Sequence, residues 1–447
     1  MSKSYVIREF GIIYNKKDYP DGTDSFNSIF IDDKPFNSLR NFIAENIDED
    51  IEIDSAFSVH RKKGKDFIRV KNYVGVIETR DHTTIEILPK IYLEKTKDEV
   101  GNTRKVFLRM LRHLKNSPFK SIDNAFLKTT KFPLLEIFIY TFLAELEVLV
   151  KRGIRKHYVN INENVRFLKG SLDFSKQVRF NLLHKERFFV NYDEFSENIP
   201  QNRLIKSTLL LLLKKTKSPK NKIRIHEFLA FMENVQESKN IHKDLSHINN
   251  LNRLFSDYAK ILPWTKVFLL GESFTNFKGN SLNKAILFPM ERIFEDYIGS
   301  GFKRYYSDSE VTLQEKKMAL VNQHNGSKKF KLKPDIVIFG DQSLIIDTKW
   351  KIIDQSKSRE NYKISQADMY QLYAYGKKYS NKMNSEPGLV LLYPKQELFN
   401  KPLSDFHYEE NLILQAIPVN LDCSLEDTIS LLHSAITINE KEIRGPD

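Results

Sequence analysis

The stretch KLKPDIVIFGDQSLIIDTKWK, residues 331–351, contains two short apolar runs, and each run carries an aspartate. The runs PDIVIFG and SLIIDTKWK have the length and the β-branched composition of two adjacent buried strands. Asp335 lies at the start of the first run and Asp347 lies within the second. A buried carboxylate costs free energy unless it has a partner, so both aspartates require an explanation.

The alternation of side chains along a strand suggests what that partner is. Asp347 and Lys349 are expected on one face of the second strand, with Thr348 on the other. If the two runs are neighbours in a sheet, Asp335 lies beside this pair. Two converging carboxylates repel each other, and a divalent cation removes the repulsion. Mg²⁺ fits best, with Mn²⁺ as an alternative, because it is a hard ion held by few carboxylates plus water and phosphate oxygens.

This arrangement predicts metal-dependent hydrolysis of a phosphodiester. Asp335 and Asp347 would ligate the ion, and the backbone carbonyl of Thr348 would add a third oxygen. Lys349 would orient the attacking water or help to deprotonate it. The alternative interpretation is structural: Asp335 caps a turn after a proline, and Asp347 forms an ordinary surface ion pair with a nearby lysine.

The rest of the chain divides into three regions and predicts a multidomain protein of the α+β and α/β classes. Residues 1–120 show alternating apolar patterns separated by turns, which predict a β-rich domain. Residues 121–283 are expected to be mostly helical. Residues 284–447 predict a central mixed sheet flanked by helices. The main elements of this last region are expected at 288–306, 310–317, 334–340, 343–351, 365–380 and 388–394.

Composition sets wider limits. The chain has 70 Lys and Arg against 58 Asp and Glu, a net charge of +12 that weakly favours a polyanionic partner. The single cysteine excludes an internal disulfide and a thiolate zinc cage. No apolar run reaches the roughly 18 residues of a membrane span, and the start of the chain lacks a secretory signal, so we expect a cytoplasmic protein. The leucine run at 209–213 is flanked by lysines and is expected in a buried helix.

Two further elements accompany the aspartates. Gln371 and Tyr375 are four residues apart in an expected helix, and Glu295 lies in the helix that precedes the strands. The pattern Pro334-Asp335 with Asp347-Thr348-Lys349 resembles the PD-(D/E)xK nuclease superfamily, which has a restriction-endonuclease-like fold. Gln371 and Tyr375 are similar to the QxxxY element of its RecB-like members. By this resemblance Glu295, Gln371 and Tyr375 are accessory site residues; otherwise the glutamate is solvated and the tyrosine packs in the core.

The resemblance extends along nearly the whole chain. Four separated segments look like the McrC family, the nuclease subunit of McrBC-type modification-dependent restriction systems: YVGVIETRDHTTIEILPKIY, VKRGIRKHYVNINENVRFLKGSLDF, ENIPQNRLIKSTLLLLL and FPMERIFEDYIGSGFKR. The resemblance implies a partner, an McrB-like hexameric AAA+ GTPase, that docks on the N-terminal region. It also implies that double-stranded, modified DNA is cut by the C-terminal domain. Because a break in both strands needs two nuclease domains, we expect two copies to meet on the DNA.

The absence of a GxxxxGK[ST] phosphate loop agrees with this division, because nucleotide is then handled by the partner and not by this chain. Two functions are therefore weighed. The first is a Mg²⁺-dependent DNA endonuclease subunit. The second is a non-catalytic adapter that activates an AAA+ motor and holds DNA on its basic surface. The charged loops 61–65 and 80–82 are candidates for stimulating the partner, although ordinary hairpin tips have the same composition.

Overall fold

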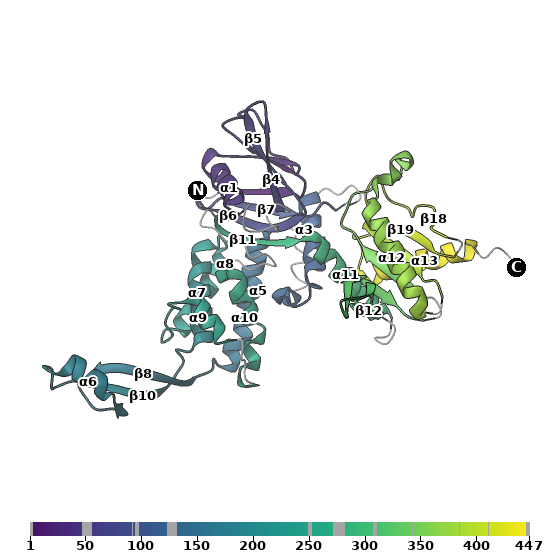
Figure 1. The fold of residues 1–447 in the computed structure, drawn as a ribbon. Coiled ribbons are helices and arrows are strands. Elements are labelled where there is room, and N and C mark those ends of the chain that lie inside the picture. Colours follow the sequence, from purple (N-terminus) through teal and green to yellow (C-terminus); the bar gives the residue numbers. More distant parts are fainter. Residues whose placement is uncertain are drawn as a thin grey trace. The chain divides into compact units, whose positions relative to one another are not determined.

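The computed structural model describes residues 3–46, 56–91, 93, 98–122, 132–248, 253–270, 282–306, 311–340, 343–383, 385–409 and 411–443. The chain separates into two compact units (Figure 1). Unit 1 comprises Met1–Lys131 and Ser273–Asp447, and unit 2 comprises Phe132–Glu272. Because unit 1 joins the first and last parts of the chain, the boundaries expected after residues 120 and 283 stay predictions. The mixed α/β class is confirmed.

The first part of unit 1 contains two four-stranded sheets. One has the order β1-β7-β6-β11, and the other has the order β3-β2-β5-β4. The helices α1 and α3 pack on these strands, and η1 follows α3. The bounds are β1 (Ser4–Arg8), β2 (Ile12–Asn15), β3 (Ser28–Ile31), α1 (Asp33–Asn46), β4 (Phe57–Lys62), β5 (Lys65–Val70), β6 (Tyr73–Thr79), β7 (Thr84–Leu88), α3 (Glu99–Leu111), η1 (Pro118–Ser121) and β11 (Leu282–Pro289).

The pairing of β6 with β11 joins distant parts of the chain within unit 1. Every residue of β6 is buried, and its central Gly75 has a φ of +138°. A side chain at this position would place its Cβ 2.0 Å from the carbonyl oxygen of Ile286 on β11. Only glycine tolerates both this backbone conformation and this close approach. The loops 61–65 and 80–82 do lie at hairpin turns, as the sequence indicated.

The last part of unit 1 contains a six-stranded mixed sheet with the order β12-β15-β16-β17-β19-β18. The strands β16, β17 and β19 are parallel to one another, and the remaining pairs are antiparallel. The bounds are α11 (Met290–Tyr305), β12 (Val311–Leu313), β13 (Ala319–His324), β14 (Ser327–Lys331), β15 (Ile336–Ile338), β16 (Leu344–Thr348), η3 (Ser358–Lys363), α12 (Gln366–Met383), β17 (Gly388–Pro394), β18 (Phe406–His407), β19 (Ile413–Val419) and α13 (Leu425–Ile443).

Side chains alternate between the two faces of β16 and β17, and those on one face pack against α12. Ile345, Leu389 and Leu391 belong to one buried cluster with Leu372 and Tyr375 of α12. The helix α11 contacts β12, β16 and α13. The expected elements of this region are therefore present, whereas the exposed β13–β14 hairpin was not expected from the sequence.

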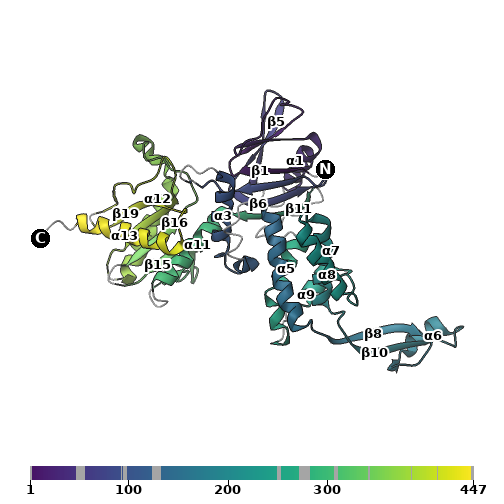
Figure 2. The ribbon, with the colours of Figure 1, turned by 180° about the vertical axis from the view of Figure 1, so that it is seen from behind.

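Unit 2 is built from helices and an arm. The helices are α5 (Leu134–Arg152), α7 (Pro200–Lys215), α8 (Pro219–Phe231), α9 (Ile241–Ser246), η2 (Arg253–Ala259) and α10 (Leu262–Leu270). Residues 157–196, here called the arm, contain β8 (His157–Val165), β9 (Ser171–Leu172), α6 (Phe174–Asn181) and β10 (Phe188–Ser196). In both views the arm extends away from the helices of its unit (Figures 1 and 2). The sequence did not reveal these strands within the mostly helical region.

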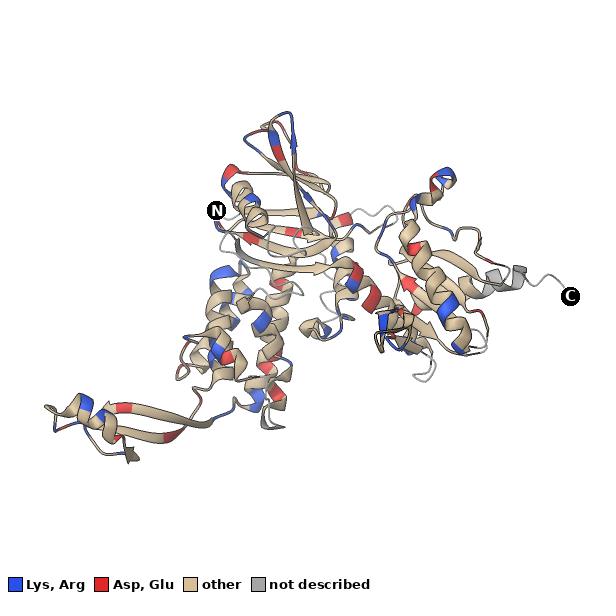
Figure 3. Cartoon of the chain, in the orientation of Figure 1, with Lys and Arg blue, Asp and Glu red and all other residues tan. Residues whose placement is uncertain are grey.

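The leucine run lies in α7, where Leu209 and Leu212 are fully buried against the other helices of the unit. This agrees with the expected core helix. Among the helices described, none combines the length and the apolar character that a membrane crossing needs. Lys and Arg residues occur on elements of both units, as Figure 3 shows.

A buried contact inside unit 1 connects the first sheet with the strand that carries Asp347. The indole Nε1 of Trp350 donates to Oε1 of Glu9 at 2.8 Å, and the backbone N–H of Lys90 donates to the same oxygen at 2.6 Å. Burial raises the pKa of Glu9 to about 7, although both hydrogen bonds oppose this. Trp350 directly follows Lys349, so this hydrogen bond fixes the backbone next to the predicted site lysine, just after the end of β16.

Candidate active site

The antiparallel pairing of β15 with β16 brings the two aspartates together. Ile336 pairs with Ile346, so Asp335, one residue before β15, lies beside the end of β16. The backbone N–H and the hydroxyl of Thr348 donate to Oδ2 of Asp335 at 2.7 and 2.8 Å. The expected juxtaposition of Asp335 and Asp347 is therefore present. The Thr348 side chain was expected to point away, but β16 ends at this residue and strict alternation ends with it.

Lys349 occupies the centre of the cluster. Its Nζ lies 2.6 Å from Oδ2 of Asp347 and donates to Oε1 of Gln371 at 3.0 Å. Nε2 of Gln371 in turn donates to the Tyr375 hydroxyl at 2.6 Å. The spacing of four residues places both side chains on one face of α12. The predicted catalytic lysine and two of the predicted accessory residues therefore form one hydrogen-bonded chain.

Glu295 joins this group from α11, the helix that contacts β12 and β16. It lies on α11 and accepts a hydrogen bond from Nε2 of Gln314, one residue after β12. Burial, followed by the charge of Asp335, raises the pKa of Glu295. The charge of Glu295 in turn helps to raise the pKa of Asp347, so the glutamate shares the electrostatic environment of the aspartates.

Burial is the largest cause of the pKa shifts at this site, and the charge of Asp347 adds to it at Asp335. Burial and the charge of Asp347 together raise the pKa of Asp335 to about 6. Burial also raises the pKa of Asp347, although the ammonium of Lys349 opposes the change. Burial disfavours the charged form of Lys349, but the carboxylates of Asp347 and Asp368 outweigh it and raise the pKa of the ammonium. Lys349 is thus held protonated, while the carboxylates remain incompletely neutralised.

The donor set suits a hard divalent cation. Asp335 and Asp347 offer carboxylate oxygens, and their raised pKa values report negative charge that a cation would neutralise. In the described part of the chain, no three His, Cys, Asp or Glu side chains gather closely enough to hold a metal by themselves. Mg²⁺ does not need such a cage, because it keeps several waters and uses one or two carboxylates. The backbone carbonyl of Thr348 stays a predicted ligand.

The sequence did not identify Asp368, which is buried at the start of α12. Its carboxylate lies 2.8 Å from Nζ of Lys351 and 3.9 Å from Nζ of Lys349. It therefore helps to hold both lysines near the site. Asp368 precedes Gln371 by three residues, so the helical period alone would have placed it on the same face.

The repulsion leads to a test of stability without metal. Asp335→Asn keeps an oxygen that can accept from Thr348 but removes one charge. A raised pKa in the folded state means that wild type loses stability as pH rises from about 4 to about 6. The variant should therefore be more stable than wild type at pH 8, by at most about 2 kcal/mol for this partly buried group, and equal to it at pH 4.

Urea unfolding in chelator at both pH values measures this difference. Glu360→Gln serves as the control, because Glu360 is an exposed carboxylate of the same unit, and it should change neither value. A variant that is less stable than wild type at pH 8 would show that the charged Asp335 carboxylate does not destabilise the fold.

Comparisons with known proteins identify the family of the chain. The family model described as McrBC 5-methylcytosine restriction system component matches residues 68–394. The structure is similar to a half-complex from the tetradecameric assembly of Thermococcus gammatolerans McrB AAA+ hexamers with bound McrC. The TM-score is 0.63 at 18% identity, and the match covers 96% of this chain and 100% of that chain.

A second match, to the cryo-EM structure of the Thermococcus gammatolerans McrBC complex, has a TM-score of 0.47 at 21% identity. It covers 68% of this chain and 88% of that one. None of the curated proteins matches the sequence. The family model spans well over half of the chain and confirms the expected family. The chain belongs to the McrBC 5-methylcytosine restriction system component family.

Proposed function

We propose that this chain is the DNA endonuclease subunit of a McrBC-like, GTP-dependent restriction system, with a Mg²⁺-dependent PD-(D/E)xK nuclease site. The convergence of Asp335, Asp347 and Lys349 at the ends of two paired strands carries the proposal. A mixed sheet with helices packed on it, and the link from Lys349 to Gln371 and Tyr375, support the superfamily assignment.

Each side chain has a role that follows from its contacts. Asp335 and Asp347 would hold Mg²⁺, with the carbonyl of Thr348 as a further ligand. The bound ion would polarise the phosphodiester and lower the pKa of a coordinated water. Lys349 is aligned by Asp347 and Gln371, so its ammonium can orient the water and donate to the phosphate oxygen on which charge develops.

The raised pKa of Lys349 bears on which of two roles it takes. A protonated ammonium is a hydrogen-bond donor and a source of positive charge, not a proton acceptor. We therefore assign Lys349 to orientation and charge stabilisation rather than to deprotonation of the water. Glu295 can add negative charge to the metal side of the site, since it already interacts with Asp335.

The proposed partner is an McrB-like AAA+ GTPase hexamer, and the proposed substrate is double-stranded modified DNA. The family match supports both, and the structurally similar McrC is bound to McrB AAA+ hexamers. The chain has no phosphate loop of its own. Cleavage of both strands would bring two nuclease domains together on the duplex.

The arm offers a surface for this partner. Although docking is expected on residues 1–120, many exposed hydrophobic side chains lie in the arm, where Leu183 is 89% exposed and Phe174 is 73% exposed. Large exposed apolar groups on a projecting element mark a protein interaction site. We therefore add the arm to the proposed docking surface. Its exposed hydrophobic residues are Tyr158, Phe167, Leu168, Phe174, Val178, Phe180, Leu182, Leu183 and Phe195.

Hydrogen bonds and an ion pair hold the base of the arm to the helices of its unit. Nδ2 of Asn202 donates to the carbonyl of Arg155 at 3.0 Å, and the Tyr258 hydroxyl accepts from the Arg155 N–H at 2.8 Å. Lys156 forms an ion pair with Glu197 at 2.9 Å across the two connections.

The nuclease assignment is tested by cleavage of methylated plasmid with the AAA+ partner, GTP and Mg²⁺. Asp347→Asn should lower the cleavage rate by more than about a hundredfold, because even residues that only support metal ligands cost ~10–100-fold. GTP turnover by the complex should be unchanged. Glu360→Gln is the matched control and should cut normally. Undiminished cutting by Asp347→Asn, with GTP turnover retained, would favour the non-catalytic adapter.

The arm assignment is tested by the double variant Val178→Asp/Leu183→Asp. Both side chains are exposed, so the fold should survive, but partner affinity should fall by at least about 2 kcal/mol if they are central to the interface. Stimulated GTP turnover should fall with it. The control Ile223→Asp/Phe231→Asp changes two exposed hydrophobic residues of α8 outside the arm. Equal affinities for the two double variants, measured by biolayer interferometry, would exclude the arm.

A further inference from the structure

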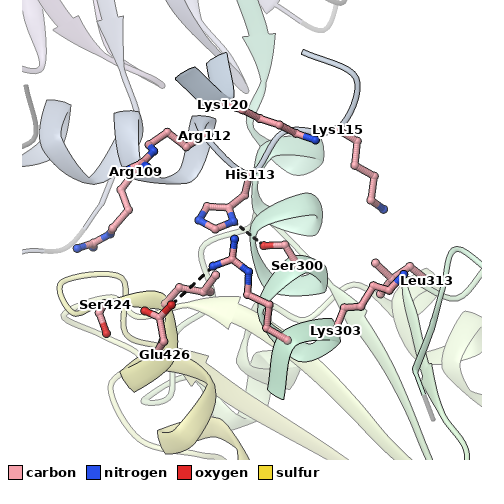
Figure 4. Close-up of a pocket in the computed structure, with 12 residues that line it drawn as sticks. Arg109, Arg112, His113, Lys115, Lys120, Ser300, Lys303, Leu313, Ser424 and Glu426 are labelled. Carbon is pink, nitrogen blue, oxygen red and sulfur yellow. Dashed lines mark hydrogen bonds and ion pairs between the residues drawn. The ribbon is translucent and has the colours of Figure 1, made fainter. Parts of the chain in front are cut away.

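A cationic cavity lies in unit 1, apart from the carboxylate cluster. It has a volume of about 950 Å³ and is formed by the end of α3 and the segment after it, by α11, and by the start of α13 (Figure 4). Half of its twelve lining residues are basic, and Glu426 is the single acid among them. The basic residues, here called the cationic pocket, are Arg109, Arg112, Lys115, Lys120, Lys303 and Arg304.

Two of these basic residues form ion pairs with acidic side chains. Lys115 lies 3.3 Å from the buried Asp296, and Arg304 lies 3.6 Å from Glu426. The Arg304 and Glu426 side chains are both well exposed, at 63% and 75%, so their pairing is weak and exchangeable. With six basic residues and one acidic residue, the lining carries an excess of positive charge, which attracts a polyanion.

The positive charge of the pocket also acts on His113. Burial, together with the charges of Arg304 and Arg112, lowers the pKa of His113 to about 4, so its imidazole is neutral at pH 7. Nδ1 of His113 lies 2.8 Å from the Ser300 hydroxyl. The floor of the pocket is therefore a neutral, hydrogen-bonded pair, with the cations around its rim.

The lining argues for a phosphate backbone rather than a small molecule. A pocket for a nucleotide base needs apolar or aromatic walls, but apart from the His113 ring this lining has only the two leucines Leu313 and Leu425. Long Lys and Arg side chains with few apolar neighbours bind phosphates without reading sequence. The ligand class with this chemistry is a DNA strand contacted through its phosphodiesters.

The position on α11 connects the pocket with the site of cutting. The same helix carries Glu295 and, eight residues later, Lys303, a separation of ~12 Å along the axis at about 1.5 Å per residue. That distance corresponds to about three to four phosphates along one strand of a duplex, whose spacing is ~3.4 Å. Leu313, in the lining, is followed directly by Gln314, which donates to Glu295.

We propose that the cationic pocket binds phosphates of the DNA strand a few nucleotides from the scissile bond and positions that strand for cutting. This inference rests on the proposed nuclease function, which it deepens. The pocket supplies affinity that is independent of sequence, while the carboxylate cluster supplies the chemistry. A free anion such as GTP shares the phosphate chemistry and has to be separated by experiment.

The test is the salt dependence of binding a fluorescent 30-base-pair duplex to the full chain in chelator, measured by anisotropy from 50 to 200 mM salt. Each lost phosphate contact reduces the slope of log affinity against log salt by ~0.9. Lys120→Gln/Arg304→Gln should therefore lower the magnitude of the slope by about 2, and Lys120→Gln alone by about 1. Lys214→Gln/Lys222→Gln removes the same charge from exposed positions of α7 and α8 and should leave the slope unchanged.

The outcomes separate the two proposals. An unchanged slope in the pocket variants, or no salt-dependent binding by wild type, overturns the cationic pocket whatever the cleavage assay shows. A lowered slope with no cleavage by wild type and partner would keep the pocket as a DNA contact and reject the nuclease. Loss of GTP binding in the pocket variants, with the DNA slope unchanged, would identify a nucleotide site and also overturn the proposal.

Discussion

The burial of two neighbouring carboxylates, Asp335 and Asp347, is the constraint on which the rest of the site depends. Antiparallel pairing of β15 and β16 forces the two carboxylates together, and burial raises the pKa of both. Hydrogen bonds from Thr348 and the ammonium of Lys349 reduce the cost without removing it. A fold with no use for this charge would be more stable with neutral side chains here, which supports the proposed cation site.

The surrounding elements hold this strained pair in one geometry. Gln371 and Asp368 on α12 align Lys349 from one side, and Glu295 on α11 faces the aspartates from the other. The buried hydrogen bond from Trp350 to Glu9 then ties the segment after β16 to the first sheet of the same unit. A shift of that sheet can therefore reach Lys349 through the adjacent Trp350.

Local periodicity explains what could be predicted from the sequence. The alternation in 343–351 placed Asp347 and Lys349 together, and the period of α12 placed Gln371 next to Tyr375. Contacts between distant segments could not be found this way: Glu9 meets Trp350 across 341 positions, and the cationic pocket combines residues near 110, 303 and 425. The strands of the arm were missed because their apolar alternation is short: Val159 and Ile161 alternate with asparagines in β8, and Val190 and Tyr192 alternate with Asn191 and Asp193 in β10.

The most direct test of the central claim is calorimetric titration of Mn²⁺ into the full chain at pH 6, in two buffers with different ionisation enthalpies. Mn²⁺ is a hard ion that accepts the same oxygen ligands as Mg²⁺. Because the pKa of Asp335 is about 6, binding should release protons, and the release should decline toward pH 8. Asp335→Asn/Asp347→Asn should not bind the ion. Equal binding by this variant, or binding without proton release at pH 6, would contradict the account.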